Sequence, residues 1–177
     1  MLTYHKTTEE EKYTICGWNY EAAYSIYNNP PYAEQLMLHR GFANPKNSFY
    51  SFHDADKLVG YINLVEEDTE VFFGIGVAPT FCNRGYGQEI CRLSRALSRQ
   101  LYPEKPMYLE VRTWNLRAVR CYEKAGFRIA GEAIKIITPN AHRRRNFLSY
   151  DSRLIHFPAR SLSPDFSILT IKNADLV

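Results

Sequence analysis

The stretch that decides the fold is residues 77–88, which read VAPTFCNRGYGQ. It follows a nearly continuous apolar run over residues 71–77, typical of a central strand, and Gly85 and Gly87 stand where a helix begins. The first N–H groups of a helix form an anion site, and glycine lets a phosphate approach closely. A simple strand-to-helix turn is the alternative. The stretch lacks the Lys-Ser/Thr pair of a Walker loop and the third glycine of a dinucleotide-binding fingerprint.

The flanking elements extend this pattern along the chain. Strands are expected over residues 2–6, 48–52, 58–65, 71–77, 107–112, 127–137 and 147–154. Helices are expected from residue 7 or 8 onward, over 33–40, around the apolar positions 90, 93, 97 and 101, and over 115–125. The strand–helix–strand unit from 71 to 112 is a parallel crossover, and the hairpins make the remainder of the sheet antiparallel. The order predicts an α/β (α+β) protein with a mixed sheet of about seven strands and helices on both faces.

Composition sets the class of protein without selecting a function. The 177 residues suit one domain, and 45% hydrophobic residues are typical of a globular chain. A net charge of +3 argues against a dedicated nucleic-acid binder. No apolar run is long enough for a transmembrane helix, and residues 1–11 are too polar for a secretory signal. The cysteines lack metal or disulfide spacing and the histidines are scattered, so we expect reduced thiols, no metal and a cytoplasmic protein (Cys16, Cys82, Cys91 and Cys121).

A second informative stretch is residues 109–127, LEVRTWNLRAVRCYEKAGF. Asn115 is a good N-cap for the helix that follows it. Ala118, Tyr122 and Ala125 share one face of that helix, because they are four and three residues apart. Two small residues around one phenol leave room for a ligand and direct a hydroxyl at it. The alternative is an ordinary half-buried tyrosine.

Together the two stretches resemble the GNAT superfamily, the acyl-CoA-dependent N-acetyltransferases. The family loop R/Q-x-x-G-x-G/A lies over residues 82–87, with Cys82 in place of the usual Arg or Gln. The later family motif N-x-x-A-x-x-x-Y-x-x-x-G-F is matched in full (Asn115, Ala118, Tyr122, Gly126 and Phe127). The resemblance covers about residues 1–154 and implies a GNAT-like acyl-CoA N-acyltransferase fold there. Residues 155–177 are then a C-terminal extension of unknown role: a disordered tail, or an arm on the domain or on the second subunit of a homodimer.

The resemblance implies acetyl-CoA as cosubstrate and assigns the residues that bind it (Val77, Cys82, Asn83, Arg84, Gly85, Tyr86, Gly87, Asn115 and Ala118). The family Arg or Gln contacts the pyrophosphate through its side chain, which Cys82 cannot do in the same way. Backbone donors from Asn83 to Gly87, with Arg84 close by, can compensate for that loss.

The resemblance also implies a direct transfer of the acetyl group to a primary amine of a small molecule or peptide. A backbone N–H near Val77 polarises the thioester carbonyl, and Tyr122 is the general acid. A phenol with a pKa of about 10 is a fair match for a leaving thiol of about 8.5. Glu70 is a weak candidate for the base, because the family position falls on Val71 and a one-residue shift needs a bulge. Glu110, Tyr61 and ordered water are the alternatives.

The acceptor cannot be identified from the sequence. The segments that usually frame it bring aromatic residues, which suit cationic or flat substrates or simply pack in the core (Trp18, Tyr20, Tyr24, Tyr27, Tyr32 and Trp114). The acidic turn 66–68 and the basic run 142–145 are better explained as solvated loops. Two other functions stay open: a non-catalytic acyl-CoA-binding or sensor domain, which Cys82 favours, and an RNA- or ribosome-binding module.

Overall fold

The computed structural model describes residues 1–130, 134–135 and 167–173. Its strands are β1 (Thr3–Lys6), β2 (Asn47–Asp54), β3 (Lys57–Glu66), β4 (Val71–Val77), β5 (Met107–Arg112), β6 (Phe127–Ile129), β7 (Ile134–Lys135) and β8 (Ser167–Asn173). Its α-helices are α1 (Glu9–Cys16), α2 (Tyr32–Met37), α3 (Tyr86–Leu101) and α4 (Leu116–Lys124). Short 3-10 turns are η1 (Ala22–Tyr27), η2 (Gly41–Ala43) and η3 (Pro79–Phe81).

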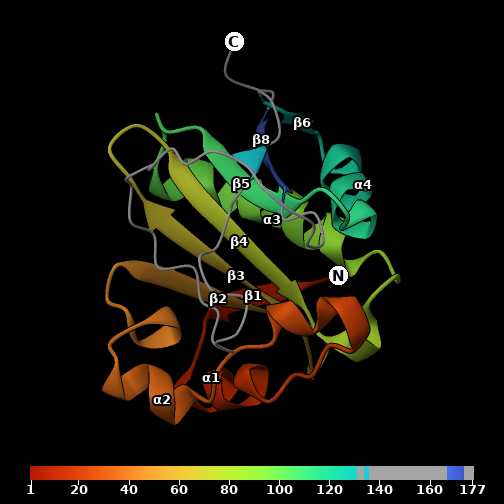
Figure 1. Ribbon diagram of the computed structural model, residues 1–177. Helices are drawn as coiled ribbons and strands as arrows, with labels where there is room; N and C mark the ends of the chain where they lie inside the picture. The colour runs from red at the N-terminus through yellow and green to blue at the C-terminus, as the bar shows by residue number, and fades with distance from the viewer. Residues whose placement is uncertain (131–133, 136–166, 174–177) are drawn as a thin grey trace.

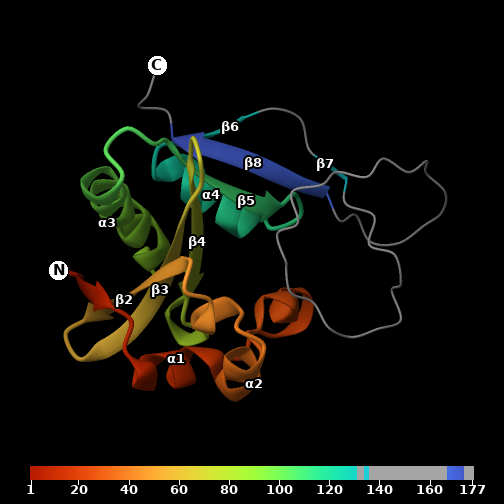
Figure 2. The same cartoon turned by 90° about the vertical axis from the view of Figure 1, so that its left-hand side faces the viewer.

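The strands form one mixed sheet, as the sequence predicts. Their order is β1-β2-β3-β4-β5-β8-β6, with β7 paired to β8 (Figure 1). The β4–β5 pair is parallel and the other pairs are antiparallel. Helices α1 and α2 lie on one side of the sheet and α3 on the other (Figure 2). Among the described residues no helix is long and apolar enough to cross a membrane.

Two apolar clusters hold these layers together. The larger one joins the sheet to α3 and α4, and Ile62, Phe73 and Ile90 are almost fully buried in it. The smaller one lies under α1 and α2, around Ile15 and Phe42. Alternation of side chains along a strand supplies one face of the sheet to each cluster.

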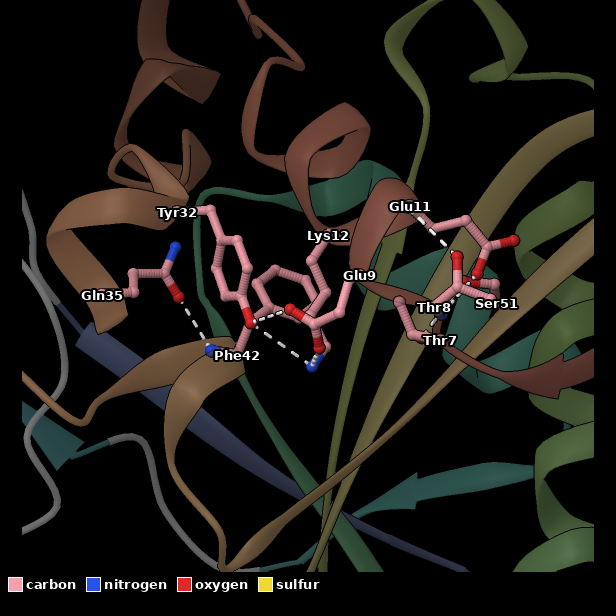
Figure 3. Close-up of polar contacts among 9 residues, drawn as sticks. All are labelled: Thr7, Thr8, Glu9, Glu11, Lys12, Tyr32, Gln35, Phe42 and Ser51. Atoms are coloured by element: carbon pink, nitrogen blue, oxygen red, sulfur yellow. Dashed lines mark hydrogen bonds and ion pairs between the residues drawn. The ribbon is translucent and has the colours of Figure 1, made fainter. Parts of the chain in front are cut away.

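Polar contacts fix the N-terminal helices over the smaller cluster. Thr8 and Glu11 form a capping box at the start of α1, in which the Glu11 carboxylate accepts the Thr8 backbone N–H at 2.8 Å. The buried Gln35 of α2 accepts the Phe42 N–H at 2.7 Å, and the Tyr32 hydroxyl donates to Glu9 at 2.6 Å (Figure 3). These bonds fix where the segment between α1 and α2 crosses the sheet.

Part of the expected C-terminal extension lies inside the sheet. Strand β8 pairs with β5 through Leu109 and Ile171, and with β6 on its other side. Residues 167–173 are therefore a strand of the sheet, which continues past residue 154. The strand expected over 147–154 lies outside the described residues. Described residues of the strand expected over 127–137 form two short strands, β6 and β7.

Strands β4 and β5 pair only at their N-terminal ends. The ladder consists of Val71 with Met107 and Phe72 with Tyr108, after which the two strands diverge (Figure 2). Beyond Phe72, the edge of β4 that faces β5 has no neighbouring strand in the described part of the chain, because β3 pairs with the other edge. We call this divergence the β4–β5 fork. The loop to α3 begins at its open end.

Candidate active site

The N-terminus of α3 is built to leave backbone donors free. Asn83 and Gly85 have left-handed backbones, with φ of 62° and 87°, and Gly85 is the N-cap. The Gly85 carbonyl accepts the backbone N–H groups of Gln88 and Glu89. The N–H groups of residues 83–87 make no hydrogen bond to any other described backbone group. Such a row of donors at the positive end of a helix is an anion site.

The two glycines of this loop are required for different reasons. A Cβ on Gly85 would have open space around it, so the positive φ alone favours glycine there. A Cβ on Gly87 would lie 2.9 Å from the Cys121 Sγ and 3.7 Å from a Val77 methyl. Gly87 therefore lets α3 approach α4 and the end of β4.

The side chains of Cys82, Arg84 and Tyr86 each contact another residue. The Cys82 thiol donates to the Val77 carbonyl at 3.6 Å. The Arg84 guanidinium lies 5.6 Å from the centre of the Phe81 ring. The Tyr86 hydroxyl donates to the Asp54 carboxylate at 2.6 Å, a contact that raises the pKa of the tyrosine. Residue 82 therefore offers no side chain to an anion, and the backbone donors and Arg84 supply the positive potential.

Val77 presents its backbone to the fork. Ala78 donates its N–H to the Val59 carbonyl at 2.9 Å, so Gly60 and Val77 form a non-hydrogen-bonded pair of the antiparallel ladder. In such a pair, the N–H and C=O of Val77 point away from β3. The Val77 carbonyl accepts the Tyr20 hydroxyl at 2.8 Å, in agreement with this direction. The Val77 N–H points to the same side, as expected for a group that polarises a carbonyl in the fork.

Helix α4 forms the opposite side. The Asn115 Oδ1 caps the helix by accepting the Ala118 N–H at 3.2 Å, and its amide group donates to the Tyr27 hydroxyl at 3.1 Å. Asn115 is buried, so its direct role is to fix the start of α4. Ala118 packs beside the larger apolar cluster, on the same face as Tyr122.

Tyr122 lies on the same helix, and its surroundings keep its hydroxyl protonated. It is half-buried and packs edge-on against Phe127, with ring centres 6.3 Å apart. Its hydroxyl makes no hydrogen bond to any described residue. Burial is the main cause that raises the pKa of this phenol, and the nearby Cys91 and Cys121 thiols add to it. The group therefore keeps its proton at neutral pH.

The structure does not bring Glu70 together with Tyr122. Glu70 precedes β4, at the end where β4 and β5 still pair, and six residue steps of strand, about 20 Å, separate Val71 from Val77. Its carboxylate forms an ion pair with Lys172 of β8. The β3–β4 register runs unbroken from Val77 to Val71, so no bulge turns Glu70 to the face of Val71.

The other expected bases differ in environment. Tyr61 packs against the smaller cluster, and burial raises the pKa of its phenol, so the phenol stays protonated and offers no phenolate to accept a proton. Glu110 is half-buried on β5, opposite Thr170 of β8. Of the expected bases, Glu110 is the carboxylate that lies on a strand of the fork, two residues beyond the last β4–β5 pair.

The segment between α1 and α2 crosses the open end of the fork. Tyr20 contacts Val77 on β4, while Tyr24 and Tyr27 pack on Trp114 at the start of α4, with ring centres 5.5 and 6.1 Å apart. The other two expected aromatic residues, Trp18 and Tyr32, belong to the smaller cluster. The segment is therefore held by both arms of the fork.

Arg117 is a residue of this site that the sequence reasoning missed. Its guanidinium lies 4.1 Å from the centre of the Tyr24 ring, which is a close cation–π contact. The signal available in the sequence was its place in the first turn of the helix that carries Tyr122.

A hollow of 420 Å³ lies beside the segment between α1 and α2, where residues 17–19 face residues 78–81.

The acidic turn at residues 66–68 has a structural role instead. Glu66 pairs with Lys105 at 2.7 Å, and the Glu67 carboxylate accepts the Tyr108 hydroxyl at 3.1 Å. Both contacts fasten the β3–β4 turn to the start of β5, away from the open end of the fork. The basic run at 142–145 lies outside the described residues.

A comparison with family models identifies the chain. Residues 12–127 match the model described as the acetyltransferase (GNAT) family, which is about two thirds of the sequence. The chain therefore belongs to the GNAT acetyltransferase family and is an acyltransferase. No curated protein matches it.

Solved structures share the fold at low sequence identity. A spermidine N-acetyltransferase from Vibrio cholerae, in complex with CoA and spermine, is similar with a TM-score of 0.65 and 16% identity, over 97% of this chain and 94% of that one. A spermidine N-acetyltransferase chimera from Vibrio cholerae and hSSAT is similar with a TM-score of 0.69 and 19% identity, over 97% of this chain and 94% of that one. AAC(6')-Ib in complex with ribostamycin and coenzyme A gives 0.66 and 18%, over 98% and 93%.

Proposed function

We propose that this chain transfers an acetyl group from acetyl-CoA directly to a primary amine of a small molecule or peptide. The observation that carries the proposal is the β4–β5 fork, which ends at the backbone donors of α3, while Tyr122 lies on the adjacent helix α4 next to Cys121, which faces Gly87. A non-catalytic domain needs the donors but has no use for a free, protonated phenol. Membership of the acetyltransferase family supports the same reaction.

Each part of the cosubstrate has a partner in this arrangement. The pyrophosphate binds the N–H groups from Asn83 to Gly87, with Arg84 nearby. The pantetheine arm enters the fork, where β4 offers the backbone groups that β5 would otherwise pair. The Val77 N–H then donates to the thioester oxygen and stabilises the negative charge that develops on it.

The chemical step needs one proton donor and one proton acceptor. The amine nitrogen attacks the thioester carbon, the C–S bond breaks, and the Tyr122 hydroxyl gives its proton to the leaving sulfur. The proton that the amine nitrogen loses passes to water or to Glu110, and finally restores Tyr122. We do not assign this role to Glu70, because Lys172 holds its carboxylate at the closed end of the fork.

The acceptor amine approaches the open end of the fork beside the Tyr20–Tyr27 segment, next to the hollow between residues 17–19 and 78–81. The spermine and ribostamycin in the similar structures are both amines of low molecular mass, which supports a small-molecule acceptor for this chain. Trp114, Tyr24 and Tyr27 offer flat surfaces for such a molecule. Homodimerisation stays a prediction.

The test is turnover of acetyl-CoA by the wild type and Tyr122→Phe with a panel of polyamines, aminoglycosides, amino acids and peptides. We expect kcat to fall by about 10²–10⁴-fold in the variant, the usual contribution of a general acid. Binding of CoA, measured by calorimetry, should stay unchanged. Tyr13→Phe, at an exposed position of α1, is the matched control.

The other outcomes separate the alternatives. Tight acetyl-CoA binding with no turnover on any amine supports a sensor domain. Absence of any thermal shift with saturating acetyl-CoA argues against both the enzyme and the sensor. Full activity of Tyr122→Phe leaves the enzyme standing but removes Tyr122 from the mechanism.

A further inference from the structure

Two histidines and a carboxylate meet at the edge of the sheet, outside the acetyl-CoA residues. The Glu11 Oε1 lies 2.9 Å from the His5 Nε2 and 3.1 Å from the His53 Nε2. The two imidazoles stack, with ring centres 5.0 Å apart and planes 18° apart. All three ligand atoms lie within 4.8 Å of one another. We call this group the His5–Glu11–His53 cluster.

Three separate elements assemble the cluster. His5 lies on β1 and is paired with Ser51 of β2, while His53 lies two residues farther along β2, paired with Thr3. The two rings therefore share one face of the sheet as diagonal neighbours. Glu11 lies in the first turn of α1, above that face (Figure 3). The sequence shows no short metal-ligand motif here, because Glu11 and His53 are 42 positions apart.

The two oxygens of Glu11 have different tasks. Oε2 accepts the Thr8 N–H at 2.8 Å and completes the capping box, which holds the side chain in one orientation. Oε1 is the atom that faces both imidazoles. The cap therefore preorganises a carboxylate oxygen between two nitrogen donors, before any ligand arrives.

The spacing of these atoms suits a small divalent ion. Metal–nitrogen and metal–oxygen distances of about 2.0–2.2 Å put neighbouring ligand atoms about 3.0–3.4 Å apart in octahedral or tetrahedral geometry. The two Nε2–Oε1 separations, 2.9 and 3.1 Å, are close to this range. Two imidazoles and one carboxylate are the ligand set that zinc and its first-row neighbours prefer over magnesium or calcium.

We propose that the His5–Glu11–His53 cluster is a binding site for a divalent transition-metal ion of the zinc type. None of its residues lies on β4, α3 or α4, so the site is separate from the acetyl-transfer chemistry. A bound ion joins the edge strand β1 and the start of α1 to β2. Its role is to fasten the N-terminal part of the domain to the sheet, with water completing the coordination.

The test uses untagged, chelator-treated full-length protein titrated with ZnCl₂. We expect one ion per chain by calorimetry, and a melting temperature that rises with the logarithm of the zinc concentration. A Co²⁺ titration reports the ligand type. A nitrogen–oxygen site gives no thiolate-to-metal charge-transfer band, whereas an ion bound at the cysteines gives one.

Variants locate the ion. His5→Asn changes an exposed ring, and Glu11→Gln removes the charge but keeps an oxygen for the capping box. Each should weaken zinc binding by at least about tenfold, the lower end of the loss caused by removing even a supporting group. His39→Asn is the matched control, because His39 is exposed and its φ of 47° is tolerated by asparagine.

Three results would overturn the proposal. They are the absence of zinc binding in the wild type, a charge-transfer band with Co²⁺, and unchanged affinity in both His5→Asn and Glu11→Gln. If the Glu11→Gln variant has a lower melting temperature than the wild type without metal, His5→Asn still tests the site, because the His5 ring is exposed.

Discussion

Tyr122 combines a hydroxyl without a hydrogen-bond partner among the described residues and a phenol whose pKa burial raises well above its usual value near 10. A general acid must carry its proton when the thiolate leaves, and a raised pKa keeps that form populated to higher pH. We therefore expect kcat to show no loss through Tyr122 below about pH 10. A pH–rate profile with a saturating amine measures this. An alkaline limb below pH 10 that disappears in Tyr122→Phe would contradict the assignment.

The Cys121 thiol should be the most reactive of the four cysteines. A hydrogen bond from Cys91 lowers its pKa, and Arg117 and Lys124 add to the effect. Burial raises the pKa of Cys16 to about 11 and also raises that of Cys82, while Cys91 is fully buried. Since the thiolate is the reactive form, iodoacetamide at neutral pH should label Cys121 first.

Peptide mass spectrometry over a time course reads this order directly. Acetyl-CoA should slow the labelling of Cys121, because the Cys121 Sγ lies next to Gly87 at the N-terminus of α3, where we propose that the pyrophosphate binds. Cys16 serves as the internal control, since it lies in the smaller cluster on the other side of the sheet. Faster labelling of Cys16 or Cys82 would show that the local charge does not decide reactivity here.

At the scale of elements, the contact of α3 with α4 depends on Gly87. An alanine there places its Cβ 2.9 Å from the Cys121 Sγ, so we expect Gly87→Ala to cost about 1–3 kcal/mol of stability and to raise the KM for acetyl-CoA. Removing the sulfur should relieve the clash. The double variant Gly87→Ala/Cys121→Ala should therefore be more stable than the sum of the single changes predicts.

Gly85→Ala is the comparison that separates crowding from backbone strain. Its Cβ has open space, and only the φ of 87° is unfavourable, at about 1–2 kcal/mol. Cys121→Ala should not rescue it. Denaturant unfolding of the wild type, Cys121→Ala, the two glycine variants and the two double variants measures both effects. Equal rescue of the two glycine variants would contradict the contact.

The sequence predicted the elements whose pattern is local. Apolar residues three and four positions apart marked α3, and the stretch around Tyr122 marked α4, both of which the structure contains. The function of Gly87 as a packing residue was not visible, because its partner Cys121 is 34 positions away. The role of Asn115 as a cap was visible, whereas its bond to Tyr27 depends on the fold.

The same limit applies to pairs that only the sheet brings together. His5 and His53 looked scattered, and Glu70 looked free until Lys172 of β8 was placed beside it. Strand β8 itself has a readable signal, the β-branched and apolar run at 168–171. Its distance from the other strands hid its place between β5 and β6, because strand order is a property of the whole chain.

At the scale of the whole molecule, β8 joins β5 to β6 within the sheet, beside the candidate active site. Ile171 is fully buried, and it lies opposite Leu109 of β5 and Ile129 of β6. Ile171→Ala should therefore cost about 2–5 kcal/mol, a large part of the 5–15 kcal/mol that a domain of this kind has. Lys172→Gln, at the next position but partly exposed, should cost less than about 1 kcal/mol.

Truncation tests the same strand more severely. A chain ending at residue 166 loses β8, which leaves β5 and β6 with unpaired edges and opens the larger apolar cluster around Ile171. We expect this chain to aggregate or to lack a cooperative thermal transition, whereas one ending at residue 173 should melt as the full chain does. Calorimetry and light scattering distinguish the two. If the chain ending at 166 folds cooperatively, another segment can take the place of β8, and the β4–β5 fork does not depend on that strand.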